Sequence, residues 1–236
     1  MATSGTATFN LDLSEIVEEA FERAGSELRT GYDLRTARRS LNLLFADWAN
    51  RGVNMWTFEQ GTINLAQGTA TYSLPADTVD LLEHVIRTQP GQQSNQADLT
   101  ITRISVSTYA TIPNKLVQGR PIQVWIQRLE TPQITVWPVP DQGTSQNPYY
   151  TFVYWRLRRI QDAGNGTNTM DVPFRFLPCL VAGLAYYLAL KIPGADARLP
   201  VLKQQYDEAW QLASDEDRDK AAVRFVPRQM FIGSGT

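Results

Sequence analysis

The spacing of apolar residues changes twice along the chain, and this change constrains the fold more than any other feature. Residues 12–25 and 33–52 place apolar side chains at helical spacing, and that spacing returns from residue 171 onward. Between them, residues 56–165 contain short runs rich in Thr, Ile, Val and Tyr, separated by glycines, prolines and polar loops. The pattern predicts an α+β fold in which an antiparallel helical bundle carries an inserted β-rich domain, either a sheet or a small barrel.

The same change predicts the domain organisation. The helical domain is expected to be split between residues 1–55 and 166–222, with the β-rich domain, 56–165, inserted between the two halves. Residues 223–236 complete no helix or hairpin and are expected to form an extended C-terminal arm that docks on another chain. The segments expected as strands are 57–65, 69–74, 80–87, 99–104, 122–129, 134–138 and 149–160, and a helical turn is expected over 105–110.

The first two helices carry recognisable start and stop signals. Asp12 and Glu15 have the spacing of a capping box, and Gly25 suits a left-handed cap at the end of the first helix. The second helix is expected to take Asp33 as its N-cap and to stop at Gly52.

The third helix is apolar around most of its circumference. It is expected to open at Asp171 and Pro173 and to end at Pro193 and Gly194. Such a helix must be covered on most faces, either by the other helices or by a neighbouring subunit. A fourth helix is expected over residues 196–222, with a single buried stripe.

Few side chains suit catalysis or metal binding. The single His84 and the single Cys179 lie in apolar runs, and we interpret both as structural residues. No glycine-rich phosphate loop is present, and the acidic residues near position 216 are mixed with basic ones instead of forming a calcium loop. The 22 basic and 24 acidic residues leave a formal net charge of -2, which supplies no basic field for gripping duplex DNA. The sequence therefore predicts no enzyme activity, no cofactor and no metal.

Two charged clusters and the arm are the candidate contact sites. Of the 22 basic residues, 18 are arginines, which are favoured in planar contacts to carboxylates across interfaces. We expect arginines on the outer face of the second helix to meet a neighbour's glutamates from the first, with internal ion pairs on a solvated face as the alternative. The candidate subunit or portal contacts are Arg35, Arg38, Arg39, Glu15, Glu18, Glu19, Glu22, Arg224, Phe225, Arg228, Met230 and Phe231.

The run YYTFVYWRLRR has apolar residues on both faces of its expected strand and ends in further arginines. Alternation places Tyr150, Phe152 and Tyr154 on one face. Val153 and Trp155 lie on the other, so both faces need cover. This favours a central strand or a strand at an interface, and a carbohydrate-stacking platform is the alternative.

Several segments between residues 11 and 227 also resemble segments of a known group of proteins, both in their sequence and in their order along the chain. They are EEAFERAG, TGYDLRTARRSLNLLFADWANRGVNMWT, YSLPADTVDLLE, IPNKLVQGRP, VWPVPD, VYWRLRRIQDAG, DVPFRFLPCLVAGLAYYLAL and DRDKAAVRFVP. With these segments the chain resembles the head-to-tail adaptor (connector) proteins of short-tailed bacteriophages, the group of tail tubular protein A and the tail accessory factors.

The resemblance implies a virion structural protein at the head-to-tail interface. It implies a ring of about twelve copies below the portal protein, with the tail nozzle and tail fibres as further partners and DNA passing transiently through the lumen. It also implies that the helical part packs into the ring and meets the portal, while the β-rich part points outward or towards the tail. The arm would reach along the portal or a neighbouring subunit.

Two other functions are compatible with the sequence. A receptor- or glycan-binding tail module would use the aromatic β-rich domain, and a cell-wall hydrolase would use an acidic cluster, through residues such as Glu15 or Glu83. The longest apolar stretch, 176–192, is too short and too interrupted to span a bilayer, and the first residues lack a secretory pattern. We therefore expect no membrane insertion. The resemblance implies synthesis in the host cytoplasm and a final location in the virion.

Overall fold

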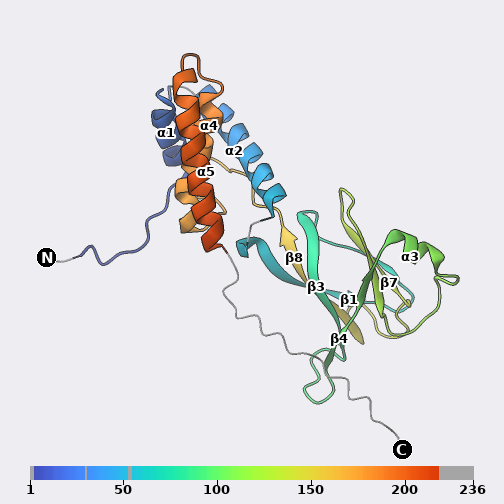
Figure 1. Cartoon of the computed structure of the whole chain (residues 1–236). Coiled ribbons are helices and arrows are strands. Elements are labelled where there is room, and N and C mark those ends of the chain that lie inside the picture. Colours follow the sequence, from blue (N-terminus) through green and yellow to red (C-terminus); the bar gives the residue numbers. More distant parts are fainter. Residues whose placement is uncertain (1–2, 30, 53–54, 218–236) are drawn as a thin grey trace, which may run out of the picture.

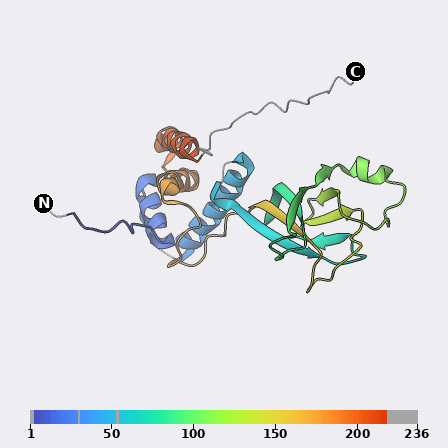
Figure 2. The same ribbon diagram turned by 90° about the horizontal axis from the view of Figure 1, so that it is seen from below.

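The structure separates the chain into a helical part and a β-rich part. The computed structural model describes residues 3–29, 31–52 and 55–217. Figure 1 shows the helices at one end of an elongated molecule and the strands at the other, and Figure 2 shows the same two parts side by side. Strands β1 (Phe58–Leu65) and β8 (Tyr150–Arg158) connect the two parts. The predicted α+β fold class is confirmed.

Four helices form the helical part and share one apolar core. They are α1 (Leu13–Ala24), α2 (Gly31–Arg51), α4 (Leu177–Ala189) and α5 (Leu199–Glu216). Helix α4 packs against the other three, and most of its residues are buried. Its all-round apolar character is therefore explained by cover from helices of the same chain, and this helix leaves no large apolar face for a neighbouring subunit.

The ends of α1 follow the predicted capping chemistry. The Asp12 carboxylate accepts the backbone N–H of Glu15 at 2.9 Å, and the Glu15 carboxylate accepts the backbone N–H of Asp12 at 3.0 Å. Gly25 closes the helix at a φ of 84°, in the left-handed region that favours glycine. The capping box and the glycine stop are confirmed.

The start of α2 differs from the prediction. The helix begins at Gly31, so Asp33 lies in its first turn and is not the N-cap. The Asp33 carboxylate accepts the backbone N–H of Arg29 at 3.2 Å. A carboxylate in the first turn also complements the helix dipole. An acidic residue near the start of a helix is therefore expected both at the N-cap and in the first turn, and the sequence does not distinguish these two positions.

The third and fourth predicted helices are shorter than expected. A 3-10 turn, Phe174–Phe176, precedes α4, and Asp171 does not cap the helix because its carboxylate binds Arg158. Helix α4 ends at Ala189, before the predicted stop at Pro193. Helix α5 likewise follows a 3-10 turn, Asp196–Arg198, and its predicted final residues 218–222 lie outside the described part of the chain.

The β-rich part contains two four-stranded sheets, in the orders β1-β8-β3-β4 and β2-β7-β6-β5. Both contribute residues to a second apolar core. A short helix, α3 (Val106–Thr111), follows the N-cap residue Ser105. The remaining strands are β2 (Thr71–Ser73), β3 (Thr78–Thr88), β4 (Ala97–Thr100), β5 (Thr102–Ile104), β6 (Gln123–Gln127) and β7 (Gln133–Trp137).

Two expectations for this part need correction. The sheets of the described residues are open, so the alternative of a small closed barrel is wrong. The segment 99–104, expected as one strand, is divided at the buried Ile101, and β4 pairs antiparallel with β3 while β5 pairs parallel with β6. The chain thus passes from one sheet to the other within a single apolar run, which periodicity does not reveal.

Strand β8 lies between β1 and β3, so it is a central strand, as its two apolar faces predicted. Tyr150, Phe152 and Tyr154 are buried in the core shared by the two sheets. These three rings therefore fill the core and form no exposed platform.

Candidate interaction surfaces

A basic hollow of about 700 Å³ lies on the outer face of α2. Arg35, Arg38 and Arg39 line it and are exposed, together with Arg159, which follows β8. Asp162 is the one carboxylate residue in its lining. None of the ion pairs seen within residues 3–29, 31–52 and 55–217 involves the three α2 arginines. The hollow therefore carries excess positive charge and suits a carboxylate-bearing partner.

A groove of about 480 Å³, here called the α1–α4 groove, lies beside α1. One wall carries four glutamates on the face of α1 turned away from the helical core, namely Glu15, Glu18, Glu19 and Glu22. The rest of the lining is mainly apolar and consists of Phe9, Leu11, Phe174, Leu177, Pro178 and Val181, with Arg23 at the α1 side. The groove thus combines an acidic wall with an apolar floor.

Two of the four glutamates are already engaged. Glu15 closes the capping box, and Glu19 pairs with Arg23 at 2.8 Å. In the described part of the chain, Glu18 and Glu22 form no ion pair. These two carboxylates are therefore the ones most available to a partner.

A single copy does not bring the two charged surfaces together. Helices α1 and α2 flank α4 on opposite sides in both Figure 1 and Figure 2. The lining of the basic hollow and the lining of the α1–α4 groove share no residue. The predicted contacts of the arm, Arg224, Phe225, Arg228, Met230 and Phe231, lie outside the described residues.

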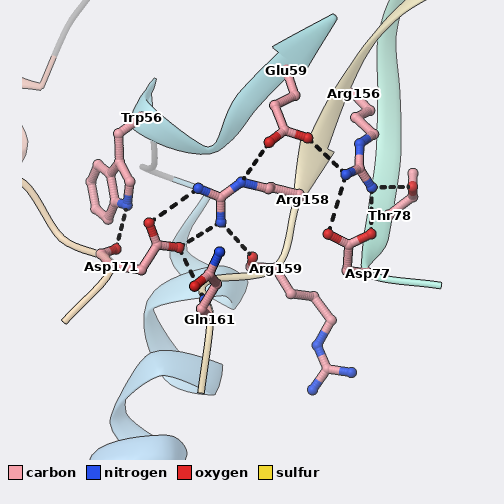
Figure 3. Close-up of polar contacts among 9 residues, drawn as sticks. All are labelled: Trp56, Glu59, Asp77, Thr78, Arg156, Arg158, Arg159, Gln161 and Asp171. Carbon is pink, nitrogen blue, oxygen red and sulfur yellow. Dashed lines mark hydrogen bonds and ion pairs between the residues drawn. The ribbon is translucent and has the colours of Figure 1, made fainter. Parts of the chain in front are cut away.

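A network of buried arginines holds the junction between the helical and β-rich parts (Figure 3). The Arg156 side chain, only 10% exposed, donates to Glu59 at 2.7 Å and to both carboxylate oxygens of Asp77, at 2.5 and 3.2 Å. It also donates to the Thr78 hydroxyl at 2.9 Å. The hydrogen bond from Arg156 lowers the pKa of Asp77 below its ordinary value.

Arg158 extends this network towards the helices. Its guanidinium pairs with Glu59 at 3.2 Å and donates to both carboxylate oxygens of Asp171, at 2.5 and 3.1 Å. The indole N–H of Trp56 donates to the Asp171 carbonyl at 2.9 Å (Figure 3). Arg156 and Arg158 are thus both engaged in ion pairs within the chain. We call this set of contacts the junction network.

The single cysteine and the single histidine are both held in their uncharged forms. Burial raises the pKa of Cys179 to about 12, so its thiol stays protonated at neutral pH. Burial lowers the pKa of His84, which keeps the imidazole uncharged. No group of three or more His, Cys, Asp and Glu side chains is placed to hold a metal ion within the described residues.

The family comparison bears directly on these surfaces. The sequence model of the SU10 adaptor protein family matches residues 11–228, which include the helical part, the β-rich part and the first residues of the arm. The chain belongs to the SU10 adaptor protein family. No curated protein matches this adaptor chain at a significant level.

Family membership supports the coarser part of the sequence interpretation. The chain is a phage adaptor with a structural role at the head-to-tail interface of the virion, where it contacts portal and tail. The family is one of structural adaptors and not of enzymes. The narrower grouping with tail tubular protein A does not follow from this match.

None of the helices in the described ranges combines the length and the apolar character that a membrane crossing requires.

Proposed function

We propose that the adaptor forms a ring, of about twelve copies, between the portal and the tail nozzle or fibres, and lines the channel through which the genome passes. We further propose that it belongs with the tail tubular proteins of short-tailed phages. The observation that carries the proposal is the presence of a basic and an acidic surface on different helices of one bundle, with no lining residue in common. A head-to-tail ring requires such a pair of different, complementary surfaces on each subunit.

The subunit contact follows from shape and charge. The glutamates of α1 lie on the face opposite its buried residues and form an acidic ridge. The basic hollow of α2 is concave and is lined by four arginines. We propose that the acidic ridge of one copy, with Glu15, Glu18, Glu19 and Glu22, faces Arg35, Arg38 and Arg39 in the hollow of the next copy. Planar arginine–carboxylate contacts would then define the register of the ring.

The domain division is part of the same proposal. We propose a helical domain of residues 1–55 and 166–222, an inserted β-rich domain of residues 56–165 and an arm of residues 223–236. The helical and β-rich cores are separate, which supports this division. The helical domain would build the ring and meet the portal, while the β-rich domain would point outward or towards the tail.

The overall charge supports the role of a channel. The formal net charge of -2 gives the chain no strong basic field. Because a protein that neutralises many phosphates binds DNA tightly, a lumen without such a field would let DNA slide.

The test uses DNA-filled heads that carry the portal and lack the adaptor. Electron microscopy of heads mixed with wild-type protein is expected to show a ring below the portal. Arg35→Glu with Arg39→Glu is expected to abolish the ring, because like charges would then face each other. The matched control is Lys203→Glu, which reverses an exposed basic residue on α5 and is expected to leave the ring intact.

A charge exchange sharpens the test. Adding Glu18→Arg and Glu22→Arg to the Arg35→Glu, Arg39→Glu chain restores opposite charges across the proposed contact and is expected to recover ring formation. Wild-type protein that fails to attach to portal-bearing heads would refute the adaptor role. Attachment without any effect of the arginine changes would refute only the proposed subunit contact.

A further inference from the structure

The α1–α4 groove has an apolar floor that is partly exposed in the described part of the chain. Phe9 and Phe174 are 67% and 69% exposed, and their rings form an edge-on pair with centroids 6.4 Å apart. Pro178 is also exposed at the start of α4, whereas Leu177 and Val181 line the groove from buried positions. Two exposed aromatic rings beside an aliphatic floor favour an apolar occupant. The acidic wall favours an occupant that also carries positive charge.

We propose that residues 223–232 of this protein dock in the α1–α4 groove. This segment contains the apolar anchors Phe225, Val226, Met230 and Phe231. From residue 221 to residue 236 the only ionisable side chains are Arg224 and Arg228. The segment thus combines apolar anchors with positive charge alone, which complements a groove that combines an apolar floor with Glu18 and Glu22.

The position at which the described chain ends supports this occupant. Asp217 directly follows α5, and its fully buried carboxylate binds Arg175 and accepts the backbone N–H of Met55 at 2.9 Å. Arg175 is the neighbour in sequence of Phe174, which lines the groove. The described part of the chain therefore ends next to Arg175, whose neighbour in sequence lines the groove.

The length of the segment is also sufficient. Eight residues separate Asp217 from Phe225, and an extended chain covers about 3.4 Å per residue, or roughly 27 Å in this interval. The acidic wall from Glu15 to Glu22 spans roughly 10 Å of helix at about 1.5 Å per residue. Residues 223–232 can therefore lie along the whole wall. The inference goes beyond the proposed ring, because it assigns an occupant to the apolar floor, which the ring contact does not use. Glu18 and Glu22 border that floor and also belong to the proposed ring contact.

Cross-linking of the full chain tests the inference in the absence of portal particles. Glu18→Cys with Met230→Cys places one thiol on the acidic wall and one in the segment, and a short bismaleimide joins the two if the segment is docked. The matched control is Val201→Cys with Met230→Cys, because Val201 is 56% exposed on α5 and lines neither the groove nor the basic hollow. Cys179 is buried and is present in both proteins.

Docking predicts that the Glu18→Cys pair reacts about fivefold faster than the same pair carrying Phe225→Ala and Phe231→Ala, since the two anchor changes leave the length of the tether unchanged. Cross-links within one copy and cross-links between copies both place the segment in the groove. The anchor changes lie outside both described cores and are expected to leave the rate of the Val201→Cys pair unchanged. Equal rates of the Glu18→Cys pair with and without the anchors, or the same loss of rate in the Val201→Cys pair, would overturn the inference. Since no portal is present, such a failure leaves the test of ring attachment unaffected.

Discussion

Arg158 and Asp171 form a two-point ion pair, at 2.5 and 3.1 Å, that ties the end of β8 to the segment leading into α4. The two side chains are 12% and 20% exposed. Hydrogen bonding to Asp171 raises the pKa of Arg158, so the guanidinium remains charged at every relevant pH. The pair therefore acts at the junction of the two parts, where it holds the β-rich part against the helical part.

Replacing Asp171 with Asn is expected to lower the free energy of unfolding by about 1.5–3 kcal/mol, the range for hydrogen bonds to charged groups. The cost arises because Arg158 would keep a largely buried charge while losing one of its two carboxylate partners. Urea unfolding at neutral pH measures the change. The control is Asp162→Asn in the neighbouring loop, an exposed carboxylate whose replacement should change stability by less than about 0.5 kcal/mol. Equal effects of the two variants would contradict the role assigned to the junction network.

Close packing between α4, α2 and α5 makes Gly183 a sensitive position. A Cβ at Gly183 would lie 2.9 Å from a ring carbon of Tyr206 and 3.0 Å from a methyl carbon of Leu44. Alanine normally stabilises a helix interior by about 1 kcal/mol relative to glycine, but overpacking costs about 1–3 kcal/mol. We therefore expect Gly183→Ala to lower Tm. Gly31→Ala in α2 is the control, because a Cβ there meets no atom within 4 Å, and Tm should stay constant or rise.

The sequence predicted those features of the fold that depend on neighbouring residues. The capping box of Asp12 and Glu15 needs residues three positions apart, and the central position of β8 follows from the alternation of its own side chains. Asp33 shows the limit of such local signals, because an acidic residue favours an N-cap and a first turn alike.

Contacts between residues far apart in the sequence could not be predicted from local sequence patterns. The ion pairs of Arg156 link residues 97 and 79 positions apart, to Glu59 and Asp77, and no local spacing marks them. The exposed arginines of α2 could be assigned to a helix face from periodicity alone. The apolar floor beside the α1 glutamates could not be predicted from periodicity, because Phe9 and Phe174 belong to segments outside the two helices that form the groove.

His84 is expected to make stability depend on pH. Burial lowers its pKa from the ordinary 6.5, and among its charged neighbours Glu83 raises it while Arg103 lowers it. The unfolded chain therefore binds a proton at a higher pH than the folded chain, and stability is lost as the pH falls below about 6.5. The lowered pKa of Asp77 has the same sign but acts at more acidic pH, below the ordinary aspartate value of 3.8.

The variant His84→Phe separates the contribution of His84 to the pH dependence of stability from that of Asp77. It removes the titrating group and keeps an aromatic ring against Phe152, whose ring centroid lies 5.9 Å away. Urea midpoints at pH 7.5 and pH 5.5 are expected to differ for the wild type and to converge for His84→Phe. If the urea midpoint of the wild type is not lower at pH 5.5 than at pH 7.5, His84 is not held neutral by burial.

The aromatic residues of the β-rich part lead to a last prediction, on the alternative of a glycan-binding module. Stacking on a sugar requires exposed ring faces, yet Tyr150 and Phe152 are buried between the sheets. Trp155 is 36% exposed on β8, whereas Trp137 lies on β7 in the other sheet and donates its indole N–H to the Asn114 carbonyl at 3.1 Å. The two indoles therefore share no sheet face. A glycan array is expected to give no reproducible hit. A hit that is abolished by Trp155→Ala or Trp137→Ala would instead support a receptor-binding role for the β-rich part.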